Sequence, residues 1–91
     1  MNRQQKRITN PDREILSIFR GLMDPANRLS VPEAMIGAVW SNETYYKSPA
    51  NHVNPLKAAR SWMQAPKHVQ HKADRFLDVF MQVDPMTVRF D

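Results

Sequence analysis

The chain has 91 residues, enough for one domain with a single modest core, and it contains no cysteine, which excludes disulfides, thiol nucleophiles and thiolate metal sites. No segment approaches the length of a membrane span, and no apolar run of the signal-peptide type follows the basic start, so we expect a cytoplasmic protein without membrane contact. The net charge of +4 at pH 7 is compatible with an anionic partner, which includes nucleic acid and acidic protein surfaces.

The chain begins with a basic segment that has no apolar periodicity. We therefore expect residues 1–9 to form a flexible basic arm. Asn10 and Pro11 then provide a helix start, with asparagine as the N-cap and proline at the first helical position. The helix that follows is predicted to end at Asp24-Pro25, because proline cannot continue the hydrogen-bond ladder. Its buried stripe is predicted to consist of Ile15, Leu16, Phe19, Leu22 and Met23.

The next segment carries the clearest helix start in the chain. Ser30-Val31-Pro32-Glu33 has the pattern of a capping box, in which the serine and glutamate side chains bond each other's backbone N–H groups. Helical spacing of apolar residues continues to Trp40, but a longer helix would place polar residues on the apolar side. The pattern therefore predicts a helix to about Trp40, a turn near Ser41, and a short helix over residues 42–47 that Pro49 stops.

A helix, a turn and a second polar helix also occur in helix-turn-helix proteins, whose second helix enters the DNA major groove. Ser41, Thr44, Tyr46 and Lys47 stand where such motifs carry polar contacts. Two features argue against this interpretation. Val39 stands where the turn glycine is usual, and the proline that follows leaves fewer than about two turns for a recognition helix. The alternative is a helical hairpin whose aromatic residues belong to the core.

Asn54 and Pro55 repeat the Asn-Pro helix start after a loop over residues 48–53. The pattern predicts a helix over residues 55–64, which ends before Pro66. On a helical wheel its apolar side consists of Leu56, Ala59, Trp62 and Met63, and its polar side consists of Lys57, Arg60, Ser61 and Gln64. We expect both tryptophans of the chain to anchor the core and the tyrosines to be half-exposed.

Residues 67–83 form the most regular amphipathic segment and predict a helix that Asp84-Pro85 closes. Its apolar stripe consists of Val69, Ala73, Phe76, Leu77, Phe80 and Met81. The tail over residues 85–91 alternates apolar and polar residues, so we expect it to be extended. It would then pack on the helices or add a strand to a partner's sheet.

These elements predict an all-α fold, a small single-domain bundle of about four helices. We expect the flexible basic arm over residues 1–9, the helical domain over residues 10–84 and the extended tail over residues 85–91. Prolines stand at nearly every predicted junction, and no strand-turn-strand pattern, internal repeat or low-complexity segment is evident.

The histidines are the main candidates for chemistry. His68 and His71 lie three residues apart, with Asp74 next at the same spacing, but two basic residues on the same face oppose a bound cation, so we expect no metal. His52 would be a general base only if the fold brought a serine and an acid to it. The chain also lacks the glycines of a phosphate-binding loop. We therefore expect a protein that is not an enzyme and that needs no cofactor.

The basic residues are concentrated in two stretches. Residues 1–11 carry three and no acid, and residues 47–75 carry six against Asp74 alone. Such residues favour binding of nucleic acid through its phosphates, although a solvated face would look the same. The helices over residues 55–64 and 67–83 form one basic surface only if they pack as a hairpin. The candidate nucleic-acid-binding residues are Arg3, Lys6, Arg7, Lys47, Lys57, Arg60, Lys67, His68, His71, Lys72 and Arg75.

Two functions follow from these features. The first is a non-enzymatic protein that binds nucleic acid as a regulator or accessory factor. The second is an adaptor or inhibitor that docks on a larger protein or nucleoprotein enzyme, by analogy with accessory proteins of phages and mobile elements. Its candidate contacts are Tyr45, Tyr46, His52 and Phe90. Exposed aromatic residues would favour the protein partner, and buried ones beside converging basic residues would favour nucleic acid. The sequence does not set the oligomeric state.

Overall fold

The computed structural model describes residues 11–82, with side chains for residues 12–79. This part of the chain forms four α-helices and three short 3-10 helices, without a strand, so the predicted all-α fold is confirmed. The basic arm, the Asn10 cap and the tail over residues 85–91 lie outside the described residues. The α-helices are α2 (Pro11–Leu22), α3 (Val31–Lys47), α4 (Pro55–Arg60) and α5 (Lys67–Gln82), and the 3-10 helices are η1 (Pro25–Asn27), η2 (Pro49–Asn51) and η3 (Trp62–Gln64).

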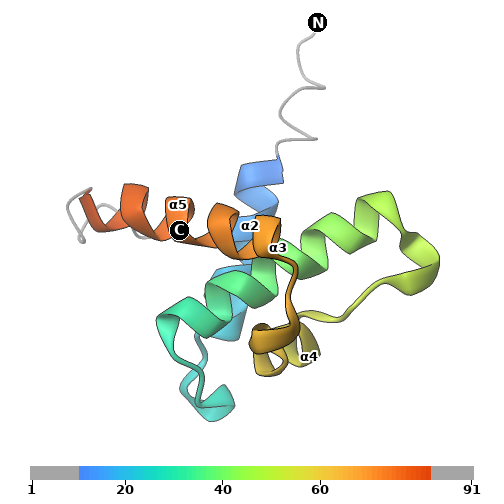
Figure 1. The fold of residues 1–91 in the computed structure, drawn as a ribbon. Helices are drawn as coiled ribbons and strands as arrows, with labels where there is room; N and C mark the ends of the chain where they lie inside the picture. Colours follow the sequence, from blue (N-terminus) through green and yellow to red (C-terminus); the bar gives the residue numbers. More distant parts are fainter. Residues whose placement is uncertain (1–10, 83–91) are drawn as a thin grey trace, which may run out of the picture.

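Helix α3 is the centre of the fold. It runs across the middle of the molecule between α5 and α4, and α2 passes behind it (Figure 1). The other three helices make most of their contacts with α3 rather than with each other. The core therefore forms around a set of buried side chains on α3: Ala34, Met35, Ile36, Ala38 and Val39.

Helices α2 and α5 bury the described parts of the apolar stripes that their sequences predict, while the side chains of Phe80 and Met81 lie outside the described residues. In α2, Ile15, Phe19 and Leu22 are buried, and the other two stripe residues pack partly buried against the core. In α5, Val69 and Ala73 are completely buried, and the next two stripe residues, at positions 76 and 77, are half-buried. Between residues 11 and 82 no helix has both the length and the apolar content needed to cross a bilayer.

The predicted helix starts of α3 and α4 are confirmed by their cap hydrogen bonds. The backbone N–H of Glu33 donates to Ser30 Oγ at 3.2 Å, and the N–H of Ser30 donates to Glu33 Oε1 at 2.8 Å, which completes the capping box. At the start of α4, the N–H of Lys57 donates to Asn54 Oδ1 at 2.8 Å. These short-range patterns need no tertiary contact, which is why the sequence alone predicts them.

Helix α3 is continuous, so the predicted turn near Ser41 and the separate helix over residues 42–47 are wrong. The helix-turn-helix interpretation of this segment fails with them. Ser41 and Asn42 are 1% and 7% exposed, on the same side of the helix as the core residues. Their polar groups are bonded to His52 and Glu14, and buried polar groups are stable when they have such partners. The helix therefore keeps its phase, and Ser41 and Asn42 are the polar part of its buried face.

The predicted helix over residues 55–64 is also wrong at its end. Helix α4 stops at Arg60, Ser61 forms a turn, and η3 follows. Because of this turn, the residues after Ser61 no longer continue the apolar side of α4. Trp62 and Met63 are 36% and 75% exposed and are not the expected core residues. Trp40 is half-buried and does pack against the core.

Small residues allow α4 to lie very close to α3. Ala58 and Ala59 are completely buried, and a Cβ placed on Gly37 would lie 2.6 Å from the Ala59 Cβ. That distance is far below van der Waals contact, so glycine at position 37 is what permits this packing.

The two connections that flank α3 share a local sequence. Pro25-Ala26-Asn27 and Pro49-Ala50-Asn51 each form a 3-10 helix, and each is followed three residues later by the cap residue of the next α-helix, Ser30 or Asn54. The sequence did not predict this short internal repeat. Its two copies are only three residues long and stand on either side of the whole of helix α3.

Candidate functional site

The predicted nucleic-acid-binding residues do not form one continuous surface. Helices α4 and α5 both pack on α3 and make at most slight contact with each other, so the hairpin that would join Lys57 and Arg60 to the basic residues of α5 is not formed. Lys47 lies at the end of α3. The three basic residues of the arm, Arg3, Lys6 and Arg7, lie outside the described residues.

The basic residues of α5 border one groove, which we name the α5 groove. It has a volume of about 540 Å³ and lies between α5 and the start of α2. Among the described residues, its polar lining consists of His68, His71, Lys72, Arg75 and one acid, Asp12, and Phe76 and Val79 supply the apolar part. Lys67 is exposed, and it directly precedes His68 at the start of α5. The groove is therefore the part of the described surface where the predicted phosphate-binding residues are closest together.

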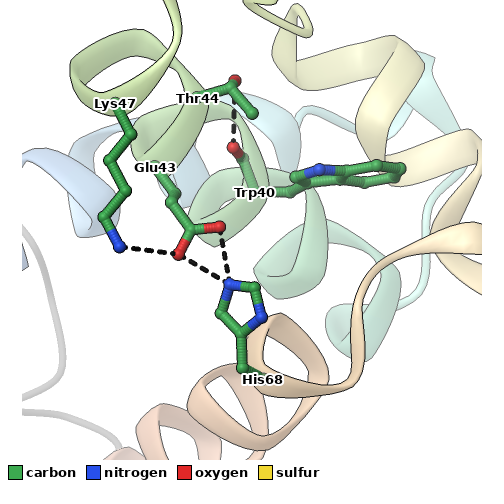
Figure 2. Close-up of polar contacts among 5 residues, drawn as sticks. All are labelled: Trp40, Glu43, Thr44, Lys47 and His68. Carbon is green, nitrogen blue, oxygen red and sulfur yellow. Dashed lines mark hydrogen bonds and ion pairs between the residues drawn. The ribbon is translucent and has the colours of Figure 1, made fainter.

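Two of the predicted basic residues are already paired with Glu43 of α3 (Figure 2). His68 Nε2 lies 2.8 Å and 2.7 Å from the two carboxylate oxygens, and Lys47 Nζ lies 3.5 Å from Oε2. The Lys47 and His68 side chains are both exposed, and surface pairs of this kind contribute at most about 1 kcal/mol. The contact connects α5 to α3 and lowers the availability of Lys47 and His68 for phosphate.

The pairing also bears on the metal site considered for α5. His68 turns toward Glu43 rather than toward His71 and Asp74. Over residues 11–82, no group of three or more potential ligands is arranged to hold a metal ion.

The fold brings His52 to a serine on α3. Ser41 Oγ lies 3.1 Å from His52 Nε2, so the fold does bring a hydroxyl to the imidazole. Ser41 is only 1% exposed, and within the described residues no carboxylate is bonded to His52. The N–H of Val53 also donates to Thr44 Oγ1 at 3.1 Å. Together these bonds hold the connection after α3 against the helix.

Three of the four predicted partner-binding residues gather on one surface, which we name the aromatic cluster: Tyr45, Tyr46 and His52. The two tyrosine rings have their centroids 4.9 Å apart and are nearly perpendicular, and the Tyr45 and His52 rings are 5.5 Å apart. Tyr45 and Tyr46 are 56% and 55% exposed. The fourth residue, Phe90, lies outside the described residues.

A pocket of about 430 Å³ lies beside the aromatic cluster, between α2 and α3, and we name it the Glu14 pocket. The Tyr46 hydroxyl donates to Glu14 Oε1 at 2.6 Å, and Asn42 Nδ2 donates to the same oxygen at 3.2 Å. The bond to the carboxylate raises the pKa of Tyr46 above its ordinary value of 10.0, since ionisation would place two negative charges side by side.

Sequence reasoning did not identify Glu14 or Asn42 as site residues. The signal for Asn42 was present, because a polar residue on the apolar side of a helix needs a buried partner. That partner lies 28 residues earlier in the chain, and no local pattern identifies it.

The amino-acid sequence matches no protein-family model and no curated protein, and the fold matches no solved structure.

Proposed function

We propose that this protein is a non-enzymatic binding protein that docks on a larger protein through the aromatic cluster. The observation that carries the proposal is the gathering of Tyr45, Tyr46 and His52 around an open pocket, with both tyrosine rings more than half exposed. Tyrosine is enriched at the centres of protein interfaces, where one rigid ring supplies both apolar area and a hydrogen bond. An adaptor or an inhibitor would both use such a surface, and we expect the partner to be cytoplasmic.

Burial of the exposed tyrosine rings on docking would stabilise the complex. Covering the exposed half of one tyrosine side chain removes about 100 Å² from water, which contributes on the order of 2.5 kcal/mol. The Tyr46 ring is held by its bond to Glu14 and by its edge contact with Tyr45, so docking orders little that is mobile beforehand. Two such residues side by side have the properties of an interface anchor.

The test is affinity capture with the full chain in nuclease-treated extract, comparing the wild type with Tyr45→Ala. Tyr45 is exposed and helical, so alanine there leaves the fold intact. Met63→Ala is the matched control, because Met63 is more exposed still but lies away from the pocket, in η3. We expect a partner that the wild type and the control retain and that Tyr45→Ala loses by about tenfold or more. Equal recovery with all three proteins would refute the proposal.

Nucleic-acid binding, as a regulator or accessory factor, is the second candidate function, and the α5 groove favours it. His71, Lys72 and Arg75 line this groove, and the arm with three further basic residues joins the chain immediately before α2, whose Asp12 borders the groove. Contacts of this kind go to phosphates and read little sequence.

The test of this candidate is binding to a random duplex of about 30 base pairs, and to its single strand, across a salt series. Replacing Lys67, Lys72 and Arg75 by alanine is expected to weaken binding and to reduce the slope of log affinity against log salt by about 2 to 3. Absence of binding at about 50 mM salt would exclude nucleic acid as the direct ligand.

A further inference from the structure

The Glu14 pocket has a polar end and an aromatic rim. Among the described residues that line it, Glu14 is the only acid, and none is a lysine or an arginine. Ser41 and Asn42 form its inner wall, and the aromatic cluster forms its outer edge. A volume of about 430 Å³ lies in the range of sites that hold a small ligand or one large side chain. The pocket therefore combines one negative charge with exposed π-systems.

The Glu14 carboxylate retains capacity to accept hydrogen bonds. Both of its donors, Tyr46 Oη and Asn42 Nδ2, bond to Oε1, and within the described residues no donor is bonded to Oε2. A carboxylate has about four acceptor positions, so an incoming donor can bond Oε2 without breaking the existing pair. The two existing bonds fix the orientation of the carboxylate before a ligand arrives.

The aromatic rim favours a flat cation. Tyr45 and Tyr46 are more than half exposed and line the same pocket as the carboxylate, and a cation within about 6 Å of a tyrosine face is attracted by the ring quadrupole. A guanidinium group suits this combination better than an ammonium group. It is planar, stacks on rings, is weakly hydrated and presents paired donors to a carboxylate.

The positive net charge of the protein is unevenly spread along the sequence. The basic excess lies in residues 1–11 and 47–75, whereas the stretch of residues 12–46 that contributes Glu14 and both tyrosines has five acidic and three basic residues. Exposed charges farther away than about 8 Å are largely screened at physiological salt. Among the described residues that line the pocket, Glu14 is the one carboxylate, so it supplies the negative charge that an incoming cation meets.

We propose that the Glu14 pocket binds the guanidinium group of an arginine that the partner protein presents. This inference rests on the proposed docking through the aromatic cluster and gives that docking its specific ligand. Glu14 Oε2 accepts the guanidinium N–H groups, and one of the two nearly perpendicular tyrosine rings stacks on one face of the guanidinium.

The first experiment uses Nα-acetyl-arginine amide as the probe and the ¹⁵N-labelled full chain as the receptor, followed by NMR. We expect saturable shifts at Glu14, Asn42 and Tyr46, with a dissociation constant of about 1 mM, as is usual for a ligand of this size. The corresponding citrulline amide has nearly the same shape without the charge and is expected to bind at least about tenfold more weakly. The lysine amide is expected to bind several-fold more weakly than the arginine amide.

Variants then assign the site. Glu14→Gln keeps an oxygen that accepts from Tyr46 and Asn42 but removes the charge, so we expect about tenfold weaker binding of the arginine amide. Asp78→Asn removes an equivalent charge from the exposed side of α5 and is the matched control, with wild-type binding expected. If Glu14→Gln fails to fold, Tyr45→Leu, which removes an exposed ring, is the second variant and is expected to weaken binding several-fold.

The inference is overturned if citrulline amide or lysine amide binds as well as arginine amide, if the shifts lie outside the pocket, or if both pocket variants bind as the wild type does. Absence of saturation at about 20 mM probe also overturns it. Its failure is distinguishable from failure of the docking proposal. A captured partner that requires Tyr45 but not the Glu14 charge would leave docking intact and would overturn only the guanidinium ligand.

Discussion

The close approach of α4 to α3 leads to a sharp prediction for Gly37→Ala. Gly37 is buried in the middle of α3, and the new Cβ would lie 2.6 Å from the Ala59 Cβ and 2.8 Å from both the Cα and the backbone nitrogen of Ala59. Carbon atoms pack at about 3.5–4.0 Å, so α4 must move by about 1 Å. Two of the three atoms belong to the backbone, so a change of rotamer cannot relieve the clash.

Two opposing contributions set the change in the free energy of unfolding that Gly37→Ala causes. Alanine is a better helix former than glycine by about 1 kcal/mol. Overpacking of a core costs about 1–3 kcal/mol, and contact with a backbone places this site at the upper end, so the net loss is about 2 kcal/mol. Gly21→Ala is the matched control, because Gly21 is exposed in α2 and its added Cβ would meet nothing within 4 Å. That change is expected to stabilise by about 0.5–1 kcal/mol.

The measurement is thermal and urea unfolding of both variants beside the wild type. For a domain of this size a change of 1 kcal/mol shifts Tm by about 4–8 °C, so Gly37→Ala is expected to lower Tm by about 10 °C and Gly21→Ala to raise it by a few degrees. Ala59→Gly in the Gly37→Ala background removes one of the three clashing atoms and is expected to restore part of the loss. If Gly37→Ala were as stabilising as Gly21→Ala, α3 and α4 would not be packed as described.

Three further changes test the cap, the core and the Tyr46 bond. Ser30→Ala removes the acceptor for the Glu33 N–H and is expected to cost about 1 kcal/mol in urea unfolding, with Ser30→Asn close to wild type; equal losses in both would contradict capping. Met35→Ala empties a fully buried position and is expected to cost about 3 kcal/mol, so a loss below about 1 kcal/mol would contradict its place in the core. Because the Glu14 carboxylate raises the pKa of Tyr46, the stability that this bond adds is complete below pH 10.0 and is lost as pH rises through the higher folded-state pKa. The wild type should therefore lose stability above pH 10.0 relative to Tyr46→Phe, and a tyrosinate absorbance titration that places Tyr46 at or below 10.0 would refute this cause.

Local signals in the sequence predicted much of the fold. The capping box at Ser30, the cap at Asn54 and the stripes of α2 and α5 depend on residues within about one or two turns, so their patterns are complete in a short window. The break predicted at Ser41 failed because the partners that satisfy Ser41 and Asn42 are 11 and 28 residues away. From the neighbouring residues alone, a buried polar residue that has a distant hydrogen-bond partner cannot be distinguished from an exposed one.

The same limit applies to the site. Tyr45, Tyr46 and His52 lie within eight positions of each other, and sequence reasoning grouped them. Glu14 stands in the first turn of α2, and no local pattern marks it as a site residue, because its role depends on α2 packing beside α3. The exposure of Trp62 was missed for a similar reason, since the turn at Ser61 that directs it outward has no strong local signal.

The central position of α3 has a consequence for how the domain opens. Since α2, α4 and α5 are each held mainly by α3, any one of them can detach while the remaining contacts persist, whereas loss of α3 removes every major interface at once. Native-state hydrogen exchange should therefore show a graded order. Amides of α5 become accessible through partial opening at low free energy, and amides in the middle of α3 exchange only when the whole domain unfolds. The last protected segment of the domain is thus the helix that also carries both tyrosines.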